Sequence, residues 1–311
     1  MKFIAKTSAI VAAITLASHA NAGLEGKIGD TEWKIGGFIE LENYYSDKAG
    51  SDATYTMRAN RSRFNLKTAT DTPEGKARTY LEFDFNGKTT DNDVEPRLRH
   101  AAIFWNGWTF GQTLSIFHNI EAYHKSVNDL MPAPIVGLSS NPLDRNPQIA
   151  YGQKLGDGYS FKVGIEKPKK DASTTRPFLA GRLAYNNKGA FAWSLSAASY
   201  EDAAGDDQFR VLAGARYKTG PFSFRLGHQY DDGIDGNSTS GSVRYNFDRK
   251  NWVSAIYEAA DVNGVDKDRG YLNYYHQLTK TVQVGFEYEK RGISGDNTEE
   301  DILRVDFKKT F

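Results

Sequence analysis

The segment Thr79-Tyr-Leu-Glu-Phe-Asp-Phe85 alternates strictly, with apolar side chains at positions 81, 83 and 85 and more polar ones between them. The same alternation recurs in Phe222-Ser-Phe-Arg-Leu-Gly-His-Gln-Tyr230 and in Val282-Gln-Val-Gly-Phe-Glu-Tyr288. Successive side chains of a β-strand point to opposite faces, so each segment has one apolar face and one polar face. The repetition of this pattern predicts an all-β protein.

About sixteen such segments lie between Trp33 and Phe311, and most have the length of about 9–11 residues that a tilted membrane strand needs. Short turns, such as Asn106-Gly107, alternate with longer polar loops, such as Gly292 to Glu300. A sheet that spans a bilayer must close, because lipid cannot pair with its edges. The pattern therefore predicts a transmembrane antiparallel β-barrel of about 16 strands. A soluble β-sandwich or β-propeller is the alternative, in which turn lengths would not sort by side. The predicted strands are 33–45, 59–68, 76–86, 96–105, 108–113, 147–154, 158–166, 177–186, 190–200, 208–218, 221–231, 239–248, 251–260, 269–278, 281–290 and 301–311.

The composition removes several other classes of protein. The 311 residues include 39 basic and 39 acidic side chains, so the net charge of zero does not favour a nucleic-acid partner. The chain has no cysteine, which excludes disulfides and thiolate chemistry. Only 39% of the residues are hydrophobic, which is few for a large packed core. Beyond residue 22 no stretch approaches the roughly 20 apolar residues of a spanning helix.

The first 22 residues have the organisation of a cleaved signal peptide. Lys2 and Lys6 precede a nearly uncharged apolar stretch, Thr7 to Ser18, which is followed by the small-residue cleavage pattern Ala20-Asn-Ala22. The alternative, a buried N-terminal helix, gives that ending no purpose. We therefore expect export, with residues 1–22 removed and residues 23–311 forming a single β-barrel domain.

Several motifs resemble those of bacterial outer-membrane proteins. Aromatic Phe311 closes a strand, as does the C-terminal signal of outer-membrane β-barrels. Other segments are similar to those of trimeric Gram-negative porins, and most of all to the DcaP-like dicarboxylate-uptake group. These segments are Arg61-Ser-Arg-Phe-Asn-Leu-Lys67, Thr79 to Phe85, Arg97-Leu-Arg-His-Ala101, Phe110-Gly-Gln-Thr113 and Asn146-Pro-Gln-Ile-Ala-Tyr151. The resemblance implies a 16-stranded homotrimeric porin in the outer membrane, whose loop between strands 5 and 6 folds into the pore. The N-terminal coiled-coil extension of the DcaP-like group has no counterpart between Gly23 and Trp33, which leaves the substrate preference open.

The connection of about 34 residues between Thr113 and Pro147 is far longer than any other. A barrel of 16 strands leaves an aqueous lumen, and loops of this length are uncommon without a function. Its mixed composition predicts that loop 114–147 is partly packed inside the barrel and constricts the lumen. The alternatives are an extracellular lid and a latch between subunits.

If the apolar positions face lipid, the opposite positions line the lumen. Basic side chains there exceed acidic ones by about seven, fifteen against eight. The basic positions are Arg61, Arg63, Arg78, Arg97, Arg99, Arg182, Arg210, Arg216, Arg225, Arg244, Arg304, Lys34, Lys67, Lys162 and Lys308. The acidic positions are Glu40, Glu42, Glu82, Asp84, Glu166, Glu287, Glu289 and Asp306. The strand at 251–260 is left out, because neither of its faces is clearly the apolar one.

Two arginine pairs dominate the predicted lumen lining. Arg61 and Arg63 precede the strand that carries Glu82 and Asp84, and Arg97 and Arg99 follow it. We expect this basic group to face Glu121 and Asp129 on the constriction loop, with Arg78 as a further lining residue. The resulting transverse field would orient dipolar or anionic solutes, because arginine binds carboxylates and rings of basic residues favour anions in pores. The alternative is that the arginines only neutralise the neighbouring carboxylates.

Other side chains suggest no chemistry. The sequence lacks the motifs of hydrolases, metalloproteases and phosphate-binding loops, so we predict neither an enzyme nor a cofactor. His100, His228 and His276 fall on the predicted lipid-facing side. Acidic loops could bind calcium that bridges lipopolysaccharide, but they lack full ligand spacing, and no metal site is predicted. Most strand-end aromatic residues fit interfacial girdles. They are Tyr44, Tyr45, Trp105, Trp108, Tyr159, Trp193, Tyr217, Tyr230, Trp252 and Tyr288.

The sequence thus predicts an outer-membrane porin. Small hydrophilic solutes would diffuse passively through its water-filled channel, with a preference for anions such as carboxylates. The expected surroundings are outer-membrane lipid and lipopolysaccharide, without nucleic acid. A general, weakly selective porin is the first alternative, and a structural or adhesive outer-membrane barrel is the second.

Overall fold

The computed structural model describes residues 24–87, 89–90, 93–118, 123–124, 131–132, 144–167, 176–202, 204–293 and 299–311. The predicted signal peptide lies outside these residues. Among the described residues, no helix has the length and apolar character needed to cross a membrane.

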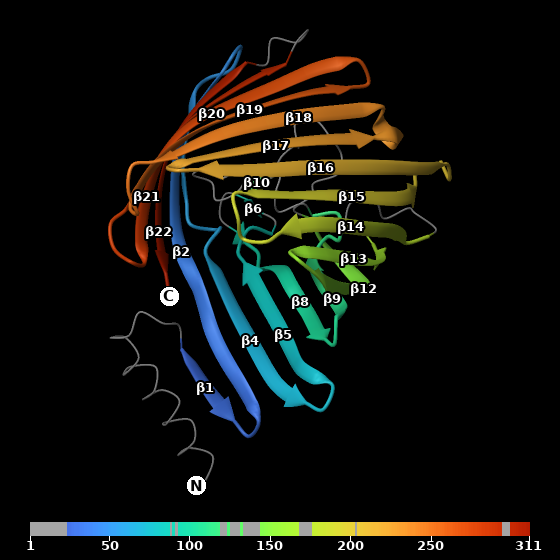
Figure 1. The fold of residues 1–311 in the computed structure, drawn as a ribbon. Helices are drawn as coiled ribbons and strands as arrows, with labels where there is room; N and C mark the ends of the chain where they lie inside the picture. Colours follow the sequence, from blue (N-terminus) through green and yellow to red (C-terminus); the bar gives the residue numbers. More distant parts are fainter. Residues whose placement is uncertain are drawn as a thin grey trace.

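Sixteen antiparallel strands form one closed barrel in the described part of the chain (Figure 1). They are β2 (Thr31–Lys48), β4 (Arg63–Thr72), β5 (Gly75–Asp84), β8 (Arg97–Trp105), β9 (Trp108–Leu114), β12 (Arg145–Gly156), β13 (Tyr159–Glu166), β14 (Phe178–Asn186), β15 (Phe191–Glu201), β16 (Asp207–Thr219), β17 (Phe222–Asp231), β18 (Gly236–Asn246), β19 (Asn251–Val262), β20 (Val265–Gln277), β21 (Val282–Ile293) and β22 (Glu300–Thr310). Each pairs with the next in chain order, and β22 pairs with β2 to close the sheet. Each overlaps one predicted strand, which confirms the all-β barrel of 16 strands.

The barrel closes at β2, its longest strand. One edge of β2 pairs with β1 (Glu25–Ile28) near its N-terminal end and with β22 over the rest of its length from Phe38. Its other edge pairs with β3 (Thr54–Arg58) and β4. The neighbouring strands leave no space for a side chain at Gly37, since a Cβ atom there would come within 2.1 Å of the Arg63 carbonyl oxygen. Gly37 and Phe311 exchange two backbone hydrogen bonds, so the C-terminal residue, one position past the end of β22, is tied to β2.

Turn geometry explains how strands of this length connect. Asn106 and Gly107 both have positive φ, as a two-residue type I′ hairpin requires. Asn263 and Gly264 form a second turn of this kind between β19 and β20. The sequence predicts a longer loop at that point, but both strands extend beyond their predicted ends. Shorter elements were not predicted. They are β6 (Thr89–Thr90), β7 (Asp93–Val94), β10 (Tyr123–His124), β11 (Met131–Pro132) and the 3₁₀ turn η3 (Asp232–Ile234).

The faces of the strands separate as the alternation predicts. On β2, Ile39 and Leu41 are exposed on the outside of the barrel, whereas Glu40 and Glu42 are buried on the inside. The large apolar side chains therefore cover the outer surface that faces lipid. The strand at 251–260, whose orientation the sequence leaves open, turns Glu258 inward and Tyr257 outward.

Two of the ten predicted girdle residues lie inside the barrel instead. Tyr44 is paired in register with lumen-facing Arg304, whose guanidinium lies 5.9 Å from the Tyr44 ring centre. Trp252 is buried and stacks on Tyr275 with ring centres 4.4 Å apart. Tyr44 lies an even number of residues from Glu42 on its strand, and Trp252 lies an even number from Glu258, so both aromatic side chains point into the lumen with these acids. Nearness to a strand end was therefore not enough to predict a place in the girdle.

Candidate functional site

Two arginines and two carboxylates form a compact ion-pair group on the lumen side of β5 and β8. Arg97 donates to Asp84 through Nε and Nη2, at 3.0 and 2.7 Å. Arg99 donates to Asp84 at 2.7 Å and to Glu82 at 2.8 Å. Asp84 is 1% exposed and Arg99 is 6% exposed. The planar guanidinium suits these paired contacts, because it presents several donors in a fixed plane.

A β-bulge in β8 brings Arg99 into this group. Glu82 is in register with His100, but the next residue, Phe83, is in register with Leu98. Arg99 is therefore the extra residue, and the inward and outward sides exchange along β8. This corrects the predicted lipid-facing orientation of His100. The bulge was readable in the sequence, since the apolar positions of the strand change from even (Leu98) to odd (Ile103).

His100 is buried among lumen residues rather than facing lipid. Its ring stacks on that of Tyr80 with centres 4.6 Å apart. Its Nδ1 lies 2.9 Å from the Thr113 hydroxyl, and its Nε2 accepts a hydrogen bond of 3.1 Å from Arg145 Nε. His100 thus connects the ion-pair group to the strands on either side of the predicted constriction loop.

A second ion-pair group continues the lumen lining across the barrel seam. Glu42 lies 2.6 Å from Arg58, 3.9 Å from Arg61 and 3.2 Å from Arg304. Arg304 also pairs with Glu287 and Glu289. We call the lumen side of β20, β21, β22, β2, β4, β5 and β8 the charged wall. Its buried charged side chains are Glu40, Glu42, Glu82, Asp84, Arg99, Glu287, Glu289, Arg304, Asp306 and Lys308.

The other half of the lumen carries many small buried side chains, alongside larger ones such as Arg210 and Glu166. We call the lumen side of β12 to β18 the small-residue wall. Its buried small residues are Ala150, Ala180, Ala192, Ser194, Ser196, Ala198, Ser238 and Ser240. Ile116 and Phe117, directly after β9, are 0% and 3% exposed and pack against Ala150, Ala180, Ala198 and Leu212. The first residues of the long connection therefore lie against this wall.

Polar contacts hold the same segment in place. Glu166 accepts hydrogen bonds from the Ser115 hydroxyl at 2.6 Å and from the Ile116 backbone N–H at 2.9 Å. The guanidinium of Arg210 lies 5.9 Å from the centre of the Phe117 ring. Further along the connection, β10 approaches β17. This contact surface was not predicted, although a row of alanine and serine residues at lumen-facing positions indicates space for another segment.

The structure brings only some of the predicted site residues together. Glu82, Asp84, Arg97 and Arg99 come together as described. Arg63 lies opposite Asp84 in register, with its guanidinium 4.8 Å from the Phe38 ring centre, whereas Arg61 belongs to the Glu42 group. Arg78 is exposed near the end of the barrel that carries the short turns. Glu121 and Asp129 lie outside the described residues.

No cluster of three or more metal-ligating side chains occurs in the described ranges. Many of the buried charged groups on the charged wall are instead paired with one another, so what this lining can offer a solute is charge and hydrogen bonds. Such a lining can select ions and polar solutes without any covalent step.

Comparison with known proteins agrees with this architecture. A sequence model of the Gram-negative porin family matches residues 7–296. No curated protein matches the chain. Among solved structures, the outer-membrane channel DcaP of Acinetobacter baumannii is similar, with a TM-score of 0.76, 21% identity, and coverage of 93% of this chain and 100% of that one. An anion-selective porin from Comamonas acidovorans has a TM-score of 0.69, 17% identity, and coverage of 90% and 100%. OmpT of Vibrio cholerae in its trimer form has a TM-score of 0.61, 13% identity, and coverage of 90% and 99%.

At these sequence identities the structural matches show the fold, whereas the match to the family model shows membership of the family. It spans nearly the whole chain, and the closed barrel of sixteen strands with a polar lumen is the architecture that such a channel needs. The chain therefore belongs to the Gram-negative porin family and forms a non-enzymatic outer-membrane channel for the diffusion of solutes.

Proposed function

We propose that this porin prefers anions, in particular small hydrophilic solutes that carry carboxylates. The observation that carries the proposal is the excess of arginine around Glu82 and Asp84 on the charged wall. Glu82 and Asp84 share Arg97 and Arg99, and Arg63 lies opposite Asp84 as a further cation. In this local group three arginines therefore meet two acids, and basic linings favour anions in pores.

The nature of arginine strengthens this argument. Its charge persists at any physiological pH, and its planar donors match a carboxylate. The resemblance in fold to an anion-selective porin points the same way. Passage requires no energy source, since the solute gradient drives diffusion.

We further propose that loop 114–147 constricts the lumen, with Glu121 and Asp129 facing the basic side chains of the charged wall. The support comes from the start of the loop, where Ile116 and Phe117 are buried against the small-residue wall. A segment held there narrows the lumen from one side and leaves the charged wall to line the open path. The transverse field between acidic loop and basic wall would orient solutes as they pass.

Three parts of the proposal concern the protein's setting. Residues 1–22 act as a cleaved signal peptide, on the evidence of Ala20-Asn-Ala22. The functional unit is a homotrimer, which the resemblance to a trimeric neighbour supports. Lipopolysaccharide surrounds the exposed apolar outer surface, as expected for a barrel in the outer membrane.

Planar-bilayer recording under a KCl gradient tests the preference for anions. We expect a reversal potential that shows excess chloride permeability in the wild type. The double substitution Arg97→Ala with Arg99→Ala should shift it toward potassium, because Glu82 and Asp84 then lose their partners. The matched control is Arg249→Ala with Lys250→Ala, which removes two positive charges from an exposed turn outside the lumen and should leave the reversal potential unchanged.

The other outcomes separate the alternatives. Equal permeabilities in the wild type indicate a general, weakly selective porin, and excess potassium permeability contradicts the proposal. A folded barrel that conducts no current would favour a structural or adhesive role. Selectivity that is unchanged in the Arg97 and Arg99 variant would mean that these arginines only neutralise neighbouring acids.

A further inference from the structure

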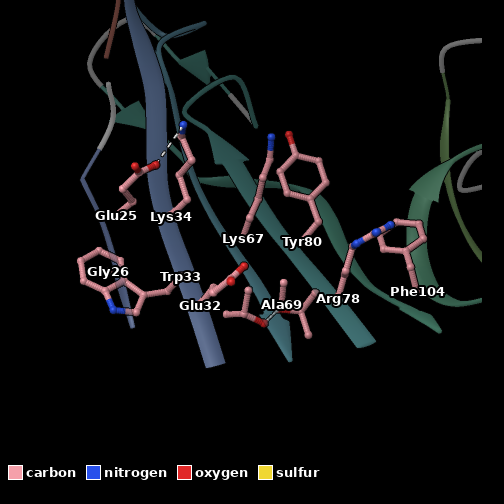
Figure 2. A pocket seen from close by; sticks show the side chains of 12 residues that line it. Glu25, Gly26, Glu32, Trp33, Lys34, Lys67, Ala69, Arg78, Tyr80 and Phe104 are labelled. Carbon is pink, nitrogen blue, oxygen red and sulfur yellow. Dashed lines mark hydrogen bonds and ion pairs between the residues drawn. The ribbon is translucent and has the colours of Figure 1, made fainter. Parts of the chain in front are cut away.

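A cavity of about 710 Å³ lies at the end of the barrel that carries the short turns, on the lumen side of β2, β4, β5 and β8 and beside β1 (Figure 2). Short turns face the periplasm in outer-membrane barrels. The cavity is thus at the periplasmic end of the charged wall, separate from the ion-pair group of Glu82, Asp84, Arg97 and Arg99, none of which lines it.

Three cationic side chains line this cavity, Lys34, Lys67 and Arg78, and Lys34 pairs with Glu25. Lys67 on β4 is in register with Tyr80 on β5, and Arg78 is the next residue on the same face of β5, so the two cations are diagonal neighbours. The Lys67 Nζ lies 5.0 Å from the Tyr80 ring centre. Figure 2 shows Lys67 and Tyr80 side by side with their tips pointing the same way, and Arg78 extending toward Phe104.

The nearby carboxylates are engaged elsewhere. Glu25 pairs with Lys34 at 3.4 Å, and Glu32 pairs with Lys76 at 3.4 Å. Within the part of the chain that the structure describes, neither Lys67 nor Arg78 forms an ion pair, and both are exposed. They differ in this from Arg97 and Arg99, whose charges are already met by Asp84 and Glu82.

The remaining lining offers apolar contact and a fixed edge. The Tyr80 ring lies beside Lys67, the Phe104 ring lies beside the end of Arg78, and Ala69 also lines the cavity. Trp33 covers Gly26 on β1, where a Cβ atom would approach the indole to 2.7 Å. This contact holds β1 along β2 and so closes one side of the cavity.

We propose that this cavity binds small organic anions that combine one anionic head group with an apolar body. Lys67 and Arg78 hold the head group through charge-assisted hydrogen bonds, and Tyr80 and Phe104 contact the body. The site lies on the channel wall, so the inference rests on the proposed function and adds to it a binding site for anions at the periplasmic end of the channel.

Calorimetric titration of the full-length protein with benzoate tests the site. We expect wild-type protein to bind benzoate, and the double substitution Lys67→Gln with Arg78→Gln to weaken binding at least about tenfold, since two charge-assisted contacts are lost. The matched control, Arg249→Gln with Lys250→Gln, removes the same two charge types from an exposed turn at the same end of the barrel and should bind like the wild type. Equal affinity in the test and control variants would overturn the proposal, as would absence of binding to the wild type.

Two further measurements separate the parts of the inference. Phe104→Ala should weaken the binding of benzoate but not that of acetate, which has no comparable apolar body, and equal losses for both would overturn the role of the apolar lining. The KCl conductance of the same wild-type preparation tests the channel independently. Conductance without benzoate binding would overturn this site and leave the proposed function standing, whereas binding without conductance would overturn the proposed function alone.

Discussion

The charged wall and the small-residue wall are built by the same strand pattern but fill their space differently. On the charged wall, long side chains such as Arg99 and Arg304 are buried against carboxylates of neighbouring strands. On the small-residue wall, Ala150 and Ala180 leave room that Ile116 and Phe117 occupy. The difference teaches that lumen-facing residues need not line an open path, because their size determines whether another segment covers them.

The two walls also differ in what stabilises them. The charged wall depends on each buried charge having a partner, since an unpaired buried ion is costly. The small-residue wall depends on apolar contact with the start of the long connection, which stabilises in proportion to the area buried. Substitutions on each wall should therefore fail in different ways.

The largest effect is expected from Arg99→Ala on the charged wall. Removing this guanidinium leaves Glu82 and Asp84 buried with fewer partners, and breaking a buried pair costs about 3–5 kcal/mol. Unfolding of the purified barrel in urea should show the loss. Arg97→Ala is the matched control, because the Arg97 side chain is 40% exposed and Asp84 keeps Arg99. If both variants lose the same free energy of unfolding, the burial of the Arg99 ion pair does not determine the stability of the charged wall.

Ile116→Ala should have a smaller effect and a different signature. The Ile116 side chain is 0% exposed, and truncating a buried isoleucine lowers the free energy of unfolding by about 2–5 kcal/mol. We expect the lower value here, because a loop can rearrange to fill the cavity. We expect urea unfolding to shift only modestly while single-channel conductance rises, as the start of the connection loosens from the small-residue wall. Ile149→Ala removes the same atoms from the exposed outer face of β12 and should not raise the conductance. A rise in that control would contradict the role of the small-residue wall.

The smallest effect is expected at Asp248, in a turn that belongs to neither wall. Its carboxylate accepts hydrogen bonds from the Asn251 side chain at 2.8 Å and from the backbone N–H groups of Lys250 and Asn251 at 2.6 and 2.8 Å. The Asn251 side chain, followed by these backbone donors, lowers the pKa of Asp248 below its ordinary value. A lowered pKa means that the stabilisation is present above the ordinary value and is lost as the pH falls through the pKa of the folded state.

Asp248→Asn tests this, because the amide resembles the protonated acid. The variant should unfold at slightly lower urea concentration than the wild type at pH 7, and the gap should shrink progressively as the pH is lowered toward 3. A gap that stays constant with pH would show that the charge of Asp248 is not involved.

The strands were accessible from the sequence because each carries its own signal. Leu81, Phe83 and Phe85 show which face of one strand is apolar, and neighbouring residues alone determine that alternation. The same local reasoning failed at His100, where the bulge exchanges the two faces of the strand. It also failed at Trp252, which was assigned to the girdle from its place near a strand end although its side chain is buried in the lumen. The site was only partly predictable. Arg97 and Arg99 pair with Glu82 and Asp84, which was the alternative arrangement, and Arg61 joins Glu42. The expected partners Glu121 and Asp129 lie outside the described residues.

The sequence by itself determined the class of fold and the number of strands, because these depend on alternation along the chain. Only the tertiary structure decided which charges are paired. Arg99 meets Asp84 through the register of two strands and a bulge. Lys67 and Arg78 have no acidic partner among the described residues, and the acids that line the same cavity, Glu25 and Glu32, pair with Lys34 and Lys76. Pairing depends on distances between strands, which closure of the barrel sets and no single segment contains.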